Sequence, residues 1–185
     1  MNTQHPSTQV AVVMRKVRID GPMSKWQPWR WELAEVVEQE AGFGTEPRLL
    51  LKSDAEERWL HPGFKVELFA TDGEGYYLNA TTEAPCWFVM WRMEEEPTIA
   101  EESLARPVAV SLSYNDAGRW LEAQENVEQV PAPEPVVDWI KAFTDEFFEP
   151  EPKRRKRPES FKSLTDRFGN PVSVSADKKF GGNNG

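Results

Sequence analysis

The chain has 185 residues, of which 11% are aromatic, including eight Trp and ten Phe. So many large apolar side chains exclude a fully disordered chain, and 15 Pro argue against a bundle of long helices. Residues 151–185 hold nine Lys or Arg and four Asp or Glu (net +5), whereas residues 1–150 hold 13 and 27 (net −14). This asymmetry indicates one acidic domain over 10–150 and a separate basic interaction segment over 151–185.

The first part of the body has the patterns of β-strands. "VAVVMRKVRI", residues 10–19, predicts a strand. In "WRWELAEVV", Trp29, Trp31 and Leu33 alternate with polar residues, which is the period of a half-buried strand. We expect the two tryptophans to face a core. A platform for stacking nucleic-acid bases would need more interleaved cations.

The middle of the chain predicts further strands and turns. "RLLLKS" predicts a short strand, and "RWLHPGF" predicts a surface turn that contains His61. "FKVELFATDGEGYYLNATT" predicts two strands joined at "DGEG". "CWFVMWRM" is apolar almost throughout and predicts a central strand with both faces covered and an inert thiol at Cys86. "EEEPTIAEESLARP" predicts a solvated acidic loop, and "VAVSLS" another strand.

The period then changes to that of helices. Ser113 precedes "YNDAGRWLEAQ" as a helix cap, and "VVDWIKAFTDEFF" spaces Val136, Ile140, Phe143 and Phe147 along one helix face. The intervening "VPAPEP" reads as a linker. We therefore predict an α+β fold: a small, mostly antiparallel β-barrel or sandwich of six to seven strands, followed by two helices and a disordered basic tail.

The sequence contains no recognisable catalytic or metal-binding motif. One cysteine excludes an internal disulfide and a cysteine zinc cluster, and two distant histidines offer no triad or metal spacing. We expect no catalytic residue, metal or cofactor. A small-molecule pocket at the barrel mouth could still be assembled from His61, Tyr77, Asn79 and Arg92, although ordinary hydrogen bonding at strand ends is the favoured interpretation.

The basic segment offers candidate partner-binding residues. Lys153, Arg154, Arg155, Lys156 and Arg157 form a run of five cations. Phe161, Leu164 and Phe168 follow at helical spacing. The favoured interpretation is an arm for an acidic protein partner. A solubilising tail and a nucleic-acid arm are the alternatives.

The sequence shows no basic leader followed by an apolar stretch, and no window of about 20 apolar residues that could cross a membrane. We therefore expect a cytoplasmic protein without a membrane span.

Three segments together resemble a bacterial family of domains of unknown function: "WQPWRWE", "KVELFATDGEGYYLNATTEAPCWFVMWR" and "VSLSYNDAGRWLEAQENVEQVPAPEPVVDWIKAFTDEFFEPEPKRRKR". The resemblance covers about 10–157, and "SYNDAGRW" departs from the family's usual "sPyEAqdY". The shared set is Tyr77, Asn79, Arg92, Trp120, Pro133, Trp139, Phe143 and the cationic run.

In the family that this chain resembles, the genes look like regular neighbours of the genes for molybdenum-dependent formate dehydrogenases. The resemblance therefore implies an accessory protein, such as a maturation factor or chaperone, that binds a formate dehydrogenase subunit or its maturation factors. The alternatives are a nucleic-acid-binding regulator that uses the basic tail, and a small-molecule-binding protein.

Overall fold

The computed structural model describes residues 5–150. In this part of the chain, two antiparallel sheets and three α-helices form the fold. The predicted α+β class and the number of strands, seven, are confirmed.

The first four strands form one sheet in the order β2-β1-β4-β3. Their bounds are Ser7–Arg18 (β1), Trp29–Glu38 (β2), Arg48–Lys52 (β3) and Glu56–Glu67 (β4). Residues 10–14 of β1 are all buried, because alternate side chains enter two different apolar clusters on the two faces of the sheet. A nearly continuous apolar run is the sequence pattern of such a doubly covered strand.

The other three strands form a second sheet in the order β6-β5-β7. Their bounds are Cys86–Met93 (β5), Ala105–Ser111 (β6) and Asn126–Pro131 (β7). The prediction that "CWFVMWRM" forms a central strand is confirmed, since β5 pairs on both sides and residues 86–90 are buried.

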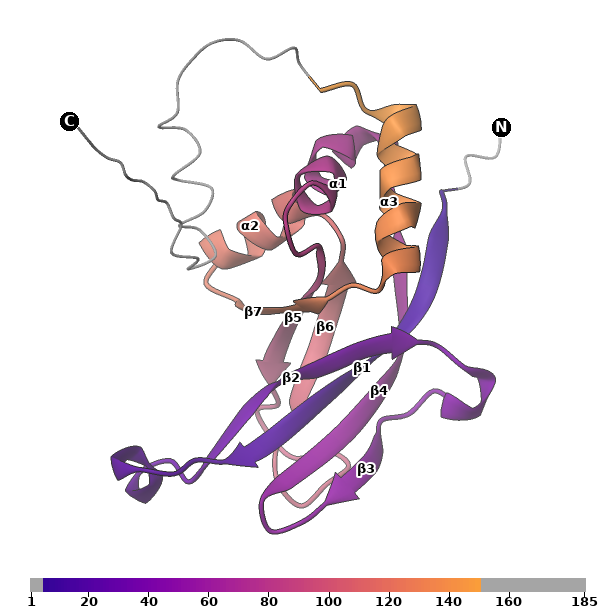
Figure 1. Ribbon diagram of the computed structural model, residues 1–185. Helices are drawn as coiled ribbons and strands as arrows, with labels where there is room; N and C mark the ends of the chain where they lie inside the picture. The colour runs from indigo at the N-terminus through magenta and orange to yellow at the C-terminus, as the bar shows by residue number, and fades with distance from the viewer. Residues whose placement is uncertain (1–4, 151–185) are drawn as a thin grey trace, which may run out of the picture. The chain divides into compact units, whose positions relative to one another are not determined.

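The helices are α1 (Gly73–Ala80), α2 (Tyr114–Glu122) and α3 (Glu134–Phe147), with short 3₁₀ turns η1 (Pro22–Lys25), η2 (Ala41–Phe43) and η3 (Ala70–Asp72). Figure 1 shows the three α-helices gathered at one end of this body and the four-stranded sheet at the other. The predicted cap is confirmed: Ser113 Oγ accepts hydrogen bonds from the backbone N–H groups of Asn115 and Asp116.

The main core lies where the two sheets and the helices meet. Met14 and Leu33 of the first sheet, Trp87 and Val89 of the second, and Ile140 of α3 belong to one buried cluster. The apolar stripe predicted for α3 is confirmed at Ile140 and Phe143, which are buried, whereas Phe147 at its end is exposed.

Four details of the predicted architecture are wrong. No closed barrel forms among the described residues, and the helices alternate with the later strands instead of following them. "YYLNAT" is part of helix α1 and not a strand. The expected linker "VPAPEP" instead begins within β7 and ends within α3.

His61 also differs from its prediction. Strand β4 continues through His61, Pro62 and Gly63, and His61 is buried in place of lying in a surface turn. Pro62 is tolerated in a strand here because β3 pairs with β4 only as far as Leu60 and the β1–β4 register shifts between His61 and Phe64. Pro62 therefore interrupts no ladder pair on either side.

Candidate functional site

The two tryptophans of β2 lie on one face of the four-stranded sheet beside a lysine from β1. Trp29 and Trp31 are both half-buried, as the alternating pattern predicts. Lys16 pairs with Trp31 across the strands, and its Nζ lies 5.3 Å from the centre of the Trp29 ring and 5.9 Å from that of Trp31. The indole faces thus bind a cation by cation–π attraction.

The connection between β5 and β6 runs beside this face and encloses a groove of about 510 Å³. That volume lies within the range of about 300–1,000 Å³ typical of ligand sites. We call it the tryptophan groove. Its lining residues are Lys16, Trp29, Trp31, Leu49, Lys52, Ser53, Glu57, Trp59 and residues 99–104.

The two members of the main ion pair in the tryptophan groove differ greatly in their exposure to solvent. Lys16 Nζ lies 2.9 Å from Glu102 Oε1, but the Lys16 side chain is only 13% exposed whereas that of Glu102 is 75% exposed. The hydrogen bond and charge of Lys16, with a smaller contribution from the charge of Lys52, lower the pKa of Glu102. Lys52 also lies 4.0 Å from Glu57.

Glu94 anchors the start of the loop that carries Glu102. Burial alone would raise the Glu94 pKa, but hydrogen bonds from Thr98, the Leu104 N–H and Arg106 hold it below the ordinary value. The prediction of a solvated loop is therefore wrong for Glu94, whose side chain is 7% exposed.

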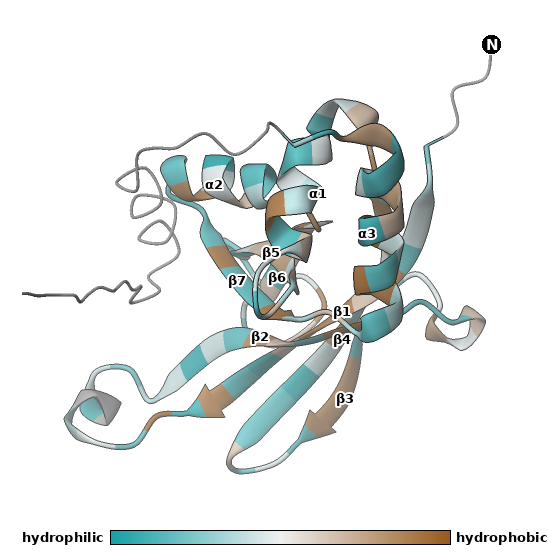
Figure 2. Cartoon of the chain, turned by 45° about the horizontal axis from the view of Figure 1, so that its top comes forward, coloured by the Kyte–Doolittle hydropathy of each residue, from teal (hydrophilic) through white to brown (hydrophobic). Residues whose placement is uncertain are grey.

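An apolar edge strand borders the tryptophan groove. β3 lies at the edge of its sheet, and its three leucines are each between 43% and 46% exposed. Figure 2 shows the hydrophobic colour of β3 at this edge. An edge strand presents unpaired backbone N–H and C=O groups, and natural proteins usually protect such an edge with charges or proline. The leucines of β3 provide no such protection at their three positions.

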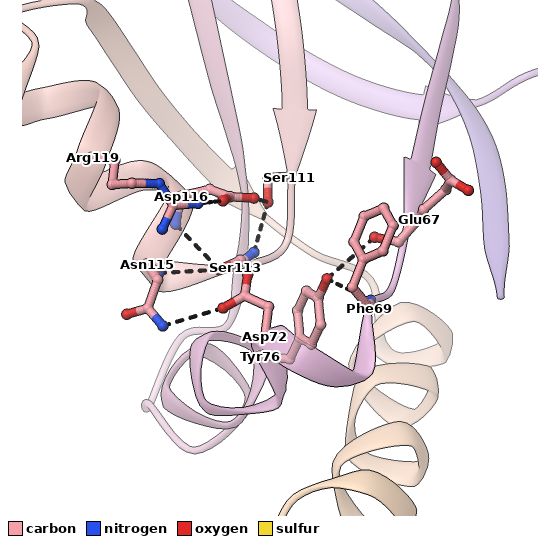
Figure 3. Close-up of polar contacts among 9 residues, drawn as sticks. All are labelled: Glu67, Phe69, Asp72, Tyr76, Ser111, Ser113, Asn115, Asp116 and Arg119. Atoms are coloured by element: carbon pink, nitrogen blue, oxygen red, sulfur yellow. Dashed lines mark hydrogen bonds and ion pairs between the residues drawn. The ribbon is translucent and has the colours of Figure 1, made fainter. Parts of the chain in front are cut away.

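A second polar cluster joins α1 to α2 (Figure 3). Asn115 Nδ2 donates to Asp72 Oδ1, and Ser111 Oγ donates to Asp116 Oδ2 at 2.7 Å. Asp116 also pairs with Arg119. The Ser113 hydroxyl caps α2, so its lone pairs already accept backbone N–H groups. The cluster therefore has a structural role, because its contacts hold the N-terminal ends of α1 and α2 together.

Tyr76 completes the same region (Figure 3), with its hydroxyl donating to Glu67 O and accepting from Phe69 N–H. Burial is the main cause that raises the Tyr76 pKa to about 12. A phenol that holds its proton so firmly is suited to tying α1 to the end of β4.

The structure gives each of the four proposed pocket residues a different set of surroundings. The Asn79 side chain is buried and bonds to Cys86 N, Cys86 O and Leu112 O. The Tyr77 ring packs against Phe148 at a tilt of 45°, and Arg92 forms a surface ion pair with Glu125. His61 is buried near Arg106 and Glu94, and burial is the main cause that lowers its pKa to about 4. Asn79 thus has a structural role.

The sequence interpretation missed the residues that form the tryptophan groove around the Trp pair. Lys16 lies in a predicted strand, but its place above Trp31 depends on the β1–β2 register. Glu102 lies in a predicted loop about 86 residues away along the chain. The one available signal was the pair Trp29 and Trp31 on one strand face.

Cys86 forms no disulfide, and its predicted burial is confirmed. Burial raises the pKa of its thiol to about 12, which disfavours the reactive thiolate. Within residues 5–150, no group of three His, Cys, Asp or Glu side chains is arranged to hold a metal ion. The predicted partner-binding residues 153–168 lie outside the described residues. Across the described part of the chain, no helix has the length and apolar character needed to cross a membrane.

A family model described as "Protein of unknown function (DUF3305)" matches residues 9–157. No curated protein and no solved structure matches the chain.

Proposed function

The chain belongs to the DUF3305 family of proteins of unknown function, and we propose that it is a non-catalytic accessory protein that acts by binding a protein partner. The observation that carries this proposal is the open, leucine-rich edge strand β3 beside the tryptophan groove. The two features share Leu49 and Lys52 and thus form one continuous surface.

An extended segment of a partner can bind this surface by adding a strand to β3. In this recognition mode, main-chain hydrogen bonds supply affinity, and pockets for alternate side chains supply specificity. β3 offers the free backbone edge and the tryptophan groove offers the pocket. Tryptophan is also among the residues most often found to dominate binding energy at interfaces.

The family resemblance supports a particular kind of partner. Because genes of the resembling family neighbour molybdenum-dependent formate dehydrogenases, the proposed partner is a subunit of such an enzyme or one of its maturation factors. The protein would then assist assembly and would not carry out chemistry itself.

Co-purification with two matched variants tests the binding surface. Leu49 in β3 is 43% exposed, and Val108 in β6, an edge strand of the other sheet, is 42% exposed. Leu49→Lys and Val108→Lys therefore introduce the same charge at equally exposed edge positions. We expect Leu49→Lys to reduce recovery of the partner from a native lysate at least tenfold, and Val108→Lys to leave it unchanged. Equal recovery with both variants would contradict docking at β3.

Deletion of the gene tests the identity of the partner. An assembly factor acts after transcription, so deletion should lower formate dehydrogenase activity much more than the amount of its transcript. Unchanged activity in the deletion strain would rule out this enzyme as the partner.

A further inference from the structure

Lys16 is a cation whose carboxylate partner is poorly anchored. Its side chain is 13% exposed, and the Glu102 side chain that pairs with it is 75% exposed and belongs to a loop. A largely buried ammonium group needs a partner, because leaving it unpaired is costly. An ion pair with an exposed carboxylate adds little stability, because the Coulomb energy gained is largely offset by the side-chain entropy lost. Another carboxylate can therefore replace Glu102 at small cost in free energy.

The charges of the other lining residues favour the binding of a single negative group. Lys52 lies 4.0 Å from Glu57, which already balances it within the tryptophan groove. Glu57 lies opposite Lys16 on β4, but its carboxylate is already engaged by Lys52 and by the Trp59 Nε1–H group. If Glu102 moves away, Lys16 therefore loses its ion pair. Glu57 and Glu101 remain in the lining and repel a chain of phosphates.

The apolar walls of the groove indicate which side chains should lie next to that negative group in the partner. Trp29, Trp31 and Trp59 offer indole surface, and Leu49 and Ile99 are apolar residues that are 43% and 47% exposed. On an extended segment, side chains at every second position point to the same face. An acidic residue at the Lys16 site would therefore place its neighbours two positions away against these apolar walls.

We propose that the tryptophan groove binds an acidic side chain of a partner's extended segment, with an apolar or aromatic residue two positions away, and that Glu102 is an internal competitor for the same site. The partner's carboxylate replaces Glu102 on Lys16 while the segment pairs with β3. The inference rests on the proposed function and specifies the partner sequence. It also makes the β5–β6 loop an autoinhibitory element.

A pair of peptides tests the inference on the full chain. The probe is acetyl-TVTETFT-amide, which places Val, Glu and Phe on one face of a strand, and its control has Gln in place of Glu. Binding is followed by calorimetry and by tryptophan emission. E102Q removes the competitor at an exposed position, so we expect the fold to stay intact. We expect it to bind the Glu peptide about two- to fivefold more tightly than the natural chain does, which is the range for loss of an exposed ion pair.

The control peptide and a second variant separate the causes. The Gln peptide should bind weakly and equally to the natural chain and to E102Q. Lys16→Gln should abolish the preference for Glu over Gln, whereas Lys16→Arg should retain it. A melting curve for each Lys16 variant checks that the fold is kept, and E102Q remains decisive if they unfold.

Several results would overturn the inference. Equal affinity of E102Q for both peptides, or no binding of either, would show that the groove does not select a carboxylate. Tighter binding of E102Q to a single-stranded oligonucleotide than to the Glu peptide would assign the site to phosphates, and self-association of E102Q would assign it to a second copy. Leu49 also lines the groove, so Leu50→Lys repeats the comparison with Val108→Lys at a β3 position outside the groove's lining. That comparison reveals separately whether docking at β3 survives.

Discussion

Gly75 lies where helix α1 passes close to the cap of α2. A Cβ atom at this position would lie 2.2 Å from Ser113 Oγ and 2.7 Å from Asp72 Oδ1. Ala normally stabilises a helix relative to Gly by roughly 0.5–1 kcal/mol. Here the crowding should dominate, because Ser113 is fully buried and holds two backbone N–H groups.

We therefore predict that Gly75→Ala lowers the free energy of unfolding by about 1–3 kcal/mol, the usual cost of overpacking. Gly42→Ala is the matched control, since nothing lies within 4 Å of a Cβ atom at Gly42. Urea denaturation of both variants measures the difference. Equal stabilities would mean that α1 and α2 are not packed this closely.

His61 makes stability depend on pH. Its folded-state pKa is lowered from 6.5 to about 4, chiefly by burial and then by the charge of Arg106, while Glu94 acts in the opposite direction. Between these two values the unfolded chain binds more protons than the folded one. Stability contributed by neutral His61 is thus fully present above pH 6.5 and is lost as the pH falls toward 4.

The expected loss over this range is roughly 3 kcal/mol, since each pKa unit corresponds to about 1.4 kcal/mol. His61→Leu should remove this part of the pH dependence, and His5→Gln should preserve it. Denaturation at several pH values between 4 and 7 measures the slope. A slope that is unchanged in His61→Leu would show that other groups cause the acid sensitivity.

The roles of several residues were predicted correctly from the sequence. These are residues whose role depends only on their neighbours along the chain. The cap at Ser113 and the buried thiol of Cys86 are examples. Lys16 and Glu102 could not be predicted as a pair, because their contact depends on how a loop of one sheet meets a strand of the other. The same holds for His61, whose burial follows from sheet packing.

At the scale of elements, helix α1 shows that glycine-rich sequences do not always predict a hairpin turn. "DGEG" resembles a hairpin turn, but its glycines serve close packing: a Cβ atom at Gly73 would lie 2.8 Å from Phe148, and Gly75 meets Ser113. Tertiary contacts that no local pattern reveals thus convert an expected strand into a helix. The strands with strong alternation or continuous apolar runs, β1, β2 and β5, were predictable because their patterns report burial directly.

Asn79 connects α1 to the second sheet, and its loss should be costly. The Nδ2 atom donates to Cys86 O and Leu112 O, both at 2.9 Å, and Oδ1 accepts from Cys86 N–H at 3.1 Å. Asn79→Ala leaves these buried backbone groups without their partner. At about 1–3 kcal/mol for each unsatisfied group, we predict a loss of stability of about 3 kcal/mol or more.

Asn115→Ala is the control for Asn79→Ala. Asn115 Nδ2 makes one hydrogen bond, to Asp72, in a partly buried setting, so its replacement should cost about 1 kcal/mol. Chemical denaturation compares the two variants. Similar losses would show that the Asn79 bonds do not carry the connection between α1 and β5.

At the scale of the whole molecule, the body and the basic segment have separate roles in this account. Residues 151–185 contain few large apolar side chains and a run of five cations. Because ordering each residue costs on the order of 1–2 kcal/mol of backbone entropy, we expect from this composition that residues 151–185 add no net stability to the body. We predict that a version of the chain that ends at Pro150 melts close to the temperature of the intact chain.

The shortened version should nevertheless bind an acidic partner more weakly, because Lys153–Arg157 no longer attract it. The difference should shrink as salt is added. Calorimetric melting and partner binding at two salt concentrations measure both effects. Unfolding of the shortened version would instead make residues 151–185 part of the folded structure.

The central claim is that a partner segment adds a strand to β3 beside the tryptophan groove, and amide hydrogen exchange of the captured complex tests it most directly. Strand addition places the free backbone N–H groups of Arg48–Lys52 in hydrogen bonds. The account predicts that exchange slows in Arg48–Lys52 and changes in residues 99–104 on partner binding, while exchange in the edge strand β6 is unaltered. Protection confined to other segments, with β3 exchanging as fast as in the free protein, would contradict it.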